Sequence, residues 1–107
     1  MEDAFLIKLR AYLEEHLSEA ELAPEKICRA MGMGRTNLHN KITALTGMAL
    51  TTYLRALRLR RAQELLRSAP QLNISEIAYE VGFDNPKYFS RVFSEEFGMS
   101  PSVFRGE

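Results

Sequence analysis

The sequence contains a single cysteine, Cys28, among its 107 residues. One cysteine cannot form an intramolecular disulfide, and it provides no cluster of thiol ligands for a metal. The composition therefore fits a reducing compartment such as the cytoplasm, and it predicts neither a metal site nor a cofactor.

Long apolar runs are also missing. The apolar segment 4–7 is short and is followed by charges, so it does not resemble a signal peptide. No stretch approaches the length of about 20 apolar residues that a membrane-spanning helix needs. With 46% hydrophobic residues, the chain can still bury a compact core. We expect one small folded domain, or two small lobes that share an element, without membrane contact.

A catalytic set of residues is absent as well. The two histidines, His16 and His39, are predicted on separate helices, one on an inward face and one on an outward face. Sequence spacing places no carboxylate or thiol beside either histidine, whereas acid–base and nucleophilic catalysis need such partners within hydrogen-bond reach. We therefore predict that the protein is not an enzyme.

Net charge is zero, because 14 basic and 14 acidic side chains cancel. Their distribution is uneven, since residues 1–27 carry a net charge of −4 and residues 28–107 carry +4. Between Arg29 and Arg67, eight basic residues stand against Glu64 alone. A basic segment of this kind is typical of phosphate binding, although a solvated basic helix face explains it equally well.

Helical periodicity dominates the sequence. Strand patterns do not compete with it, because period-two alternation and Asn-Gly turns are absent. Prolines suit several of the helix starts, and glycines suit several of the helix ends. The sequence thus predicts an all-α protein with about seven helices, at about 3–18, 24–31, 35–46, 49–68, 75–81, 86–97 and 101–104.

The segment 49–68 is predicted as a long connector helix. It has one apolar stripe within 50–57 and another within 59–66, displaced from the first by more than a third of a turn. A helix with two displaced stripes must pack on different neighbours at its two ends. We expect it to join two lobes, at about 20–48 and about 74–105.

The two lobes match each other in sequence. A helix-turn-helix needs a small side chain where its helices approach and a residue that tolerates positive φ in the turn. Cys28 and Ala78 are the small residues, which predicts a buried structural role for Cys28, and Gly32 and Gly82 are the turn residues. Two helix-turn-helix copies are therefore predicted. The matched residues are Ile27, Cys28, Met31, Gly32 and Met33 with Ile77, Ala78, Val81, Gly82 and Phe83 at an offset of 50, then Leu38, Ile42, Gly47, Met48 and Tyr53 with Phe89, Phe93, Gly98, Met99 and Phe104 at an offset of 51.

The second helix of each copy has a polar outer face. In 35–46, the residues Leu38, Ile42 and Leu45 are predicted to point inward. Polar residues at positions i, i+3, i+4 and i+7 then share the outer face. This arrangement is typical of a helix that enters the major groove of DNA. The outer residues are Thr36, His39, Asn40 and Thr43 in the first copy and Lys87, Ser90, Arg91 and Ser94 in the second.

Three motifs carry a resemblance to a known family. They are R-x-R-R-A-x-E-L-L at 58–66, I-S-E-I-A-Y-E-V-G-F at 74–83, and Y-F-S-R-V-F with F-G-M-S-P within 88–101. Together they resemble the DNA-binding domain of AraC/XylS-type transcriptional regulators, over about residues 20–105. The acidic first helix resembles versions of this domain at the C-terminal end of longer regulators, including response regulators and hybrid two-component sensors.

The resemblance implies sequence-specific binding of double-stranded DNA, with the helices 35–46 and 86–97 in successive major grooves. It also implies RNA polymerase and a sensory or receiver domain as partners. By register with the family, the base-contacting residues would be Thr36, His39, Asn40, Lys87, Ser90 and Arg91. The phosphate-contacting residues would be Arg35, Thr43, Arg58, Pro86 and Ser94.

The length of the predicted connector agrees with this geometry. Twenty helical residues span about 30 Å, close to the roughly 34 Å between major-groove faces one turn apart. A protein-interaction module that has lost DNA affinity remains the alternative, because the net charge is neutral. The connector arginines also keep two possible roles, since Arg58 and Arg61 could pair with Glu64, Glu76 or Glu80 instead of phosphates.

Several residues depart from the usual pattern of the family. Asn40 stands where a basic residue is common, and Ser94 and Glu95 replace a pair that is often basic. Gly34 replaces a frequent serine cap, and Leu50 replaces a frequent proline. Fewer charges near phosphates predict weaker non-specific binding with a flatter salt dependence.

Overall fold

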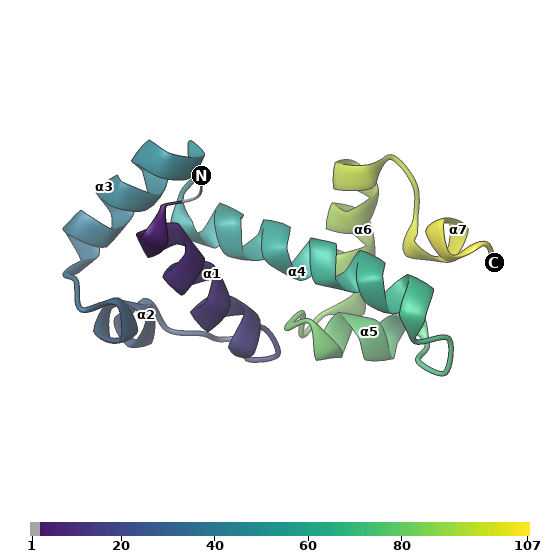
Figure 1. Ribbon diagram of the computed structural model, residues 1–107. Helices are drawn as coiled ribbons and strands as arrows, with labels where there is room; N and C mark the ends of the chain where they lie inside the picture. The colour runs from purple at the N-terminus through teal and green to yellow at the C-terminus, as the bar shows by residue number, and fades with distance from the viewer. Residues whose placement is uncertain (1–2) are drawn as a thin grey trace. The chain divides into compact units, whose positions relative to one another are not determined.

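The computed structural model describes residues 3–107, and the described part of the chain is all-α, as predicted (Figure 1). None of its helices is both long and apolar enough to cross a membrane. The seven helices are α1 (Ala4–Glu15), α2 (Pro24–Met31), α3 (Arg35–Thr46), α4 (Leu50–Ser68), α5 (Ile74–Glu80), α6 (Pro86–Phe97) and α7 (Pro101–Arg105).

The chain divides into two compact units, and the division falls within α4. Unit 1 comprises the residues up to Leu17 together with Glu21–Leu57, and therefore holds α1, α2, α3 and the first part of α4. Unit 2 comprises Ser18–Ala20 and Arg58–Glu107, with the rest of α4 and α5 to α7. The two apolar stripes of α4 belong to different cores, one in each unit.

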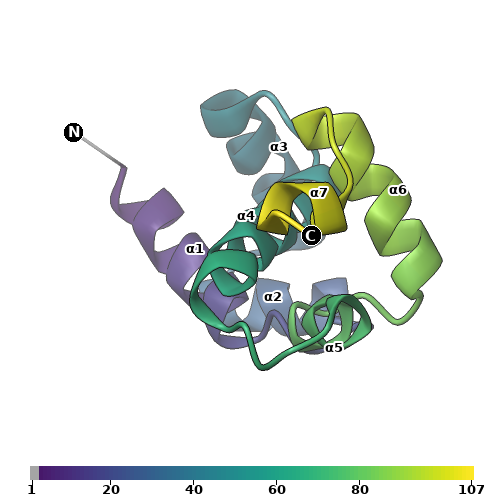
Figure 2. The ribbon, with the colours of Figure 1, turned by 90° about the vertical axis from the view of Figure 1, so that its right-hand side faces the viewer.

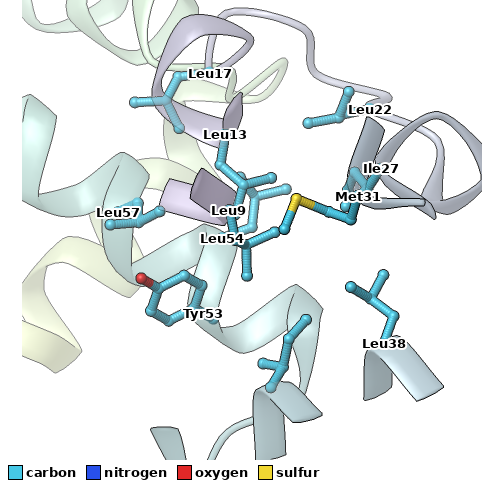
Figure 3. Packing of buried hydrophobic residues seen from close by; sticks show 11 residues of the cluster. Leu9, Leu13, Leu17, Leu22, Ile27, Met31, Leu38, Tyr53, Leu54 and Leu57 are labelled. Carbon is cyan, nitrogen blue, oxygen red and sulfur yellow. The ribbon is translucent and has the colours of Figure 1, made fainter. Parts of the chain in front are cut away.

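The core of unit 1 draws side chains from all four of its helices (Figure 3). Leu9 and Leu13 of α1 are fully buried one helical turn apart, together with Ile42 of α3. The prediction for Leu45 is wrong, because this side chain is 40% exposed. Within the described part of unit 1, the neighbouring elements therefore leave this side of the last turn of α3 partly uncovered. The other core residues of unit 1 are Leu17, Leu22, Ile27, Met31, Leu38, Tyr53, Leu54 and Leu57.

The core of unit 2 is rich in aromatic rings. Phe89 and Phe93 of α6 are fully buried, with their ring centroids 5.7 Å apart. Phe93 also contacts the rings of Phe97 and Phe104 at centroid distances of 4.6 and 5.6 Å, in edge-to-face geometry. Such ring pairs add to the burial of apolar area, so α6 is held firmly against the rest of unit 2.

Both units end the first helix of their helix-turn-helix in the same way. Gly32 and Gly82 have φ values of 67° and 96°, a conformation that side-chain-bearing residues rarely adopt. Each glycine and the residue after it donate the two backbone bonds of a Schellman motif, which satisfies the last carbonyls of the helix. The four bonds run from Gly32 to Arg29 (3.3 Å), Met33 to Cys28 (3.0 Å), Gly82 to Tyr79 (3.1 Å) and Phe83 to Ala78 (2.9 Å).

Several helix boundaries differ from the prediction by one to three residues. Helix α1 ends at Glu15 rather than near residue 18, and the ring of His16 just beyond it stacks on Tyr12 with centroids 4.3 Å apart. Helix α5 begins at Ile74 rather than at Ser75, because Asn73 caps it. The Asn73 side chain accepts from the Glu76 N–H at 2.8 Å, and the Glu76 carboxylate accepts from the Asn73 N–H at 2.9 Å.

Arg105 ties the end of the chain to the end of α4. Its guanidinium donates to the carbonyls of Leu66, Ala69 and Leu72 at 3.2, 3.1 and 2.6 Å. The side chain is only 10% exposed, and Figures 1 and 2 both show α7 beside the C-terminal end of α4. Leu66 lies in the last turn of α4, where carbonyls have no helical partner, and Ala69 and Leu72 lie in the segment after the helix. One arginine therefore satisfies three backbone acceptors.

Replacing Arg105 with methionine should lower the free energy of unfolding by about 2–4 kcal/mol, because bonds to a charged donor contribute about 1.5–3 kcal/mol each and are not additive. Denaturant titration followed by circular dichroism measures this loss. Arg60→Met is the matched control, since Arg60 is an exposed arginine of α4, the helix that Arg105 contacts. A loss no larger than that of the control would contradict the structural role of Arg105.

Candidate nucleic-acid interface

The predicted contact residues of α3 share one exposed face. Arg35, Thr36, His39, Asn40 and Thr43 are all exposed, while the residues on the opposite side are buried in the core of unit 1. The N-cap, a glycine, makes no side-chain hydrogen bond to the first turn of the helix. The structure therefore brings these five predicted residues together on one surface.

Arg35 has a carboxylate partner on the preceding helix. Its Nη1 atom lies 3.6 Å from Oε1 of Glu25, with both side chains mostly exposed. An exposed ion pair of this kind contributes little to stability. The guanidinium is therefore free to exchange Glu25 for another anion at small cost.

The polar face of α6 begins at a capped helix start. The side chain of Asn85 accepts from the N–H groups of Lys87 and Tyr88 at 3.0 and 3.1 Å, and Pro86 occupies the first turn. Asn85, Lys87, Tyr88 and Arg91 line an open depression of about 320 Å³. Lys87 and Arg91 are exposed there. Sequence reasoning missed Asn85, although an asparagine directly before a proline is a recognisable helix-start signal.

The serines of α6 are less accessible than the charged residues. Ser90 and Ser94 are half-buried, and the Ser94 hydroxyl donates to the carbonyl of Ser90 at 2.8 Å. Its hydrogen is thus used within the helix, and only the lone pairs of the oxygen face outward. Pro86 is half-buried as well, and it has no N–H to offer to a phosphate.

Arg58 does not lie on either polar face. Its Nη2 atom donates to the carbonyl of Glu19 at 2.7 Å, and its Nε atom is buried without a hydrogen-bond partner. Burial lowers the pKa of Arg58, an effect that the nearby Asp84 carboxylate partly opposes. The guanidinium is therefore engaged inside unit 2, and the predicted phosphate contact by Arg58 would have to compete with this hydrogen bond.

Arg61 forms an ion pair with Glu64, which is one of the three carboxylate partners expected for the arginines of the connector helix. Its Nη1 atom lies 2.8 Å from Oε2 of Glu64, one turn along α4. Both side chains are about half exposed. For this arginine the structure supports pairing within α4.

Cys28 is less buried than its counterpart Ala78. The thiol-bearing residue is half-buried, whereas Ala78 is fully buried. Cys28 lines a largely apolar pocket of about 190 Å³ in unit 1, which also includes Arg35 and His39 of α3. Cys28 is thus partly buried rather than buried as predicted, and its side chain packs against the core of unit 1. Among residues 3–107, no cluster of three or more histidine, cysteine or acidic side chains could hold a metal ion.

Comparison with known proteins gives the family. A family model described as a helix-turn-helix domain matches residues 27–107, which is most of the chain. The chain belongs to this helix-turn-helix family. The predicted resemblance to AraC-type DNA-binding domains is confirmed by a structure from Chromobacterium violaceum described as AraC-type, with 25% identity and a TM-score of 0.87 over 95% of this chain and 89% of that one.

Two curated relatives extend this helix-turn-helix assignment. The transcriptional activator RhaS of Salmonella schwarzengrund is 38% identical over 96% of this chain, and a histidine kinase of Formosa agariphila is 33% identical over 98%. The chain spans only 36% of the length of that RhaS protein and 8% of that kinase.

Two further solved structures are similar in fold. One is the C-terminal domain of AraT, a response regulator from Geobacillus stearothermophilus, at 31% identity and a TM-score of 0.84 over 97% of this chain and 85% of that one. The other is the DNA-binding domain of AdpA in complex with a target DNA, at 28% identity and a TM-score of 0.84 over 98% and 92%. This chain is thus similar in fold to a domain of a response regulator and to a domain solved on DNA.

Proposed function

We propose that this chain is the sequence-specific DNA-binding domain of a longer bacterial transcriptional regulator, with α3 and α6 as its two recognition helices. The observation that carries the proposal is the exposed polar face of each of these helices, opposite a buried core in its own unit. The AdpA domain solved with its target DNA supports the same use of the fold.

The residues on the two faces suit base recognition. Arg91 can donate two hydrogen bonds to O6 and N7 of guanine, and Asn40 can make a bidentate pair with adenine. Thr36 and His39 can donate or accept on the same face of α3, as can Ser90 on α6. Discrimination of one base from another is assigned to these residues and to Lys87.

Other residues are better suited to phosphates, which position the protein without reading sequence. Arg35 lies at the first turn of α3 and Lys87 at the first turn of α6, and both charged side chains are exposed. Lys87 is thus placed where it can contact a phosphate as well as a base edge. The other proposed phosphate contacts are Thr43, Pro86 and Ser94. Pro86 can contribute only packing, and the Ser94 hydroxyl can only accept a hydrogen bond.

Selection from a randomised pool of duplex DNA tests the proposal. The purified chain is incubated with the pool at low salt, and the bound duplexes are amplified and sequenced over several rounds. Enrichment of one sequence motif is expected. Recovery of the pool without enrichment, or no binding at any salt concentration, would remove DNA recognition and leave a helical protein-interaction module as the function.

We extend the proposal to the longer protein. A sensory or receiver domain is expected in the same polypeptide, as the response regulator AraT and the long relatives suggest. RNA polymerase is the proposed partner at a promoter, which places the regulator in the cytoplasm. Transcription in vitro from a template that carries the selected motif tests this extension, and unchanged transcript levels on addition of the full-length regulator would argue against it.

A further inference from the structure

Arg91 lies between two neighbours on the exposed face of α6. Tyr88 precedes it by almost one turn and Glu95 follows it by one turn. The guanidinium carbon Cζ is 5.2 Å from the centroid of the Tyr88 ring, and Nε is 3.9 Å from Oε1 of Glu95. We propose that Tyr88 and Glu95 are positioning residues that restrict Arg91 to guanine. This inference rests on the function proposed above.

The atoms involved explain the choice of base. A guanidinium has five N–H donors in a rigid planar fork. Because Nε is the guanidinium atom that lies beside the Glu95 carboxylate, the Nη1 and Nη2 atoms remain for a ligand. Guanine presents two acceptors, O6 and N7, side by side in the major groove, whereas adenine presents N7 beside an amino donor. A guanidinium held by its Nε edge therefore matches guanine and is mismatched with adenine.

Without these neighbours, Arg91 would be a poor reader of bases. A long flexible arginine can reach phosphate oxygens as well as base edges, and phosphate contacts do not depend on sequence. The Tyr88 ring limits the guanidinium through a cation–π contact, and the Glu95 carboxylate limits its rotation about the last side-chain bonds. Fewer accessible conformations mean that fewer alternative acceptors compete with guanine.

The ion pair has different strengths in the free and bound states. In the free protein, the side chains of Arg91 and Glu95 are 67% and 68% exposed, so water screens their attraction. In a DNA groove, water is displaced and the effective dielectric constant falls, which strengthens the pair. The same carboxylate is repelled by phosphates at every sequence. Glu95 therefore lowers affinity for all DNA while raising the preference for the site that Arg91 fits, a form of discrimination against wrong partners.

The experiment compares binding to a guanine and to a modified guanine. Each guanine of the selected motif is first replaced in turn by 7-deazaguanine, which lacks N7. The guanine that Arg91 contacts is identified as the one whose replacement weakens binding of the native chain but does not weaken binding of Arg91→Ala. Fluorescence anisotropy then gives the dissociation constants of each variant for the selected duplex, its 7-deazaguanine version and a random duplex. The ratio of the first two constants measures discrimination.

Removing Glu95 should change affinity and discrimination in opposite directions. Glu95→Ala is expected to bind random DNA about two- to fivefold more tightly, since one charge repelled by phosphates is lost. Its discrimination should fall by about fivefold, within the range that one bidentate pair provides. Tyr88→Leu should also lower discrimination, whereas Tyr88→Phe, which keeps the ring, should not.

Glu96→Ala is the matched control, because Glu96 is exposed on the same helix but points away from the Arg91 side. It should tighten binding to all DNA and leave discrimination unchanged. Equal behaviour of Glu95→Ala and Glu96→Ala would overturn the inference, because Glu95 would then act only through its charge. A motif in which no guanine depends on Arg91 would also overturn it while leaving the proposed function intact. Absence of any motif would instead refute the proposed function itself.

Discussion

Replacing Arg91 with alanine should weaken binding to the selected DNA site by about 10- to 100-fold, because a bidentate arginine–guanine contact contributes about 1–3 kcal/mol of discrimination. Random duplexes should lose much less affinity, since they offer no fixed guanine at that position. Arg91 is exposed and lies opposite the buried rings of α6, so the substitution should leave the fold intact. Competition titrations with selected and random duplexes measure both losses.

Lys87→Ala is the comparison variant, because it distinguishes the loss of a phosphate contact from the loss of a base contact by Arg91. If Lys87 mainly contacts a phosphate, its loss should weaken binding to selected and random DNA about equally, and it should reduce the slope of log K against log salt concentration by about 1. Equal effects of the two substitutions on both duplexes would show that Arg91 does not read a base. A selective effect of Lys87→Ala would move Lys87 among the base readers.

Phe93→Ala should lower the free energy of unfolding by about 3–5 kcal/mol, the usual loss when a buried phenylalanine is truncated. Phe93 is fully buried, and its ring contacts three others, including Phe104 of α7 and Phe97 at the end of α6. The loss combines burial of apolar area, the cavity left behind and the ring contacts. Denaturant titration monitored by circular dichroism measures it.

The control for Phe93→Ala is Val103→Ala. Val103 lies on α7 in the same unit, but it is 60% exposed, so its truncation should change stability by less than about 0.5 kcal/mol. A loss of less than 1 kcal/mol for Phe93→Ala would contradict the packing described for unit 2. Because Phe93 anchors the helix that carries Arg91, weaker DNA binding by this variant is expected at temperatures where unit 2 begins to unfold.

Much of the fold follows from local signals in the sequence. Gly32 and Gly82 mark the two turns because a left-handed backbone conformation there requires glycine or a similarly permissive residue. Proline at the first turn and glycine after the last turn give α6 its bounds. The polar faces of α3 and α6 were predictable for a similar reason, because spacing alone decides which residues share one side of a helix.

The parts that could not be predicted depend on contacts between distant residues. Arg105 satisfies carbonyls more than 30 positions away along the chain, and Arg58 donates to the carbonyl of Glu19 at a separation of 39 positions. Nothing in the local sequence distinguishes these arginines from Arg60 or Arg61. The exposure of Leu45 has the same origin: its spacing fits the apolar stripe of α3, but the described elements of unit 1 leave it 40% exposed.

The two copies of the helix-turn-helix differ in what they offer to DNA. The second copy contains two of the three motifs on which the predicted resemblance rests, with Arg91 in one of them, whereas the first copy contains none, and its α3 begins without a side-chain cap. We therefore expect Thr36, His39 and Asn40 to contribute most to which sequence is preferred. Substitution of these three residues should change only the half of the selected DNA motif that α3 contacts.

The central claim is that both polar faces read DNA in successive major grooves. Hydroxyl-radical footprinting of the chain on its selected duplex, combined with methylation interference, tests it most directly. Two protected segments with centres about 10 base pairs apart, each with bases whose modification blocks binding, are the predicted result. Protection and interference confined to a single groove segment would contradict it.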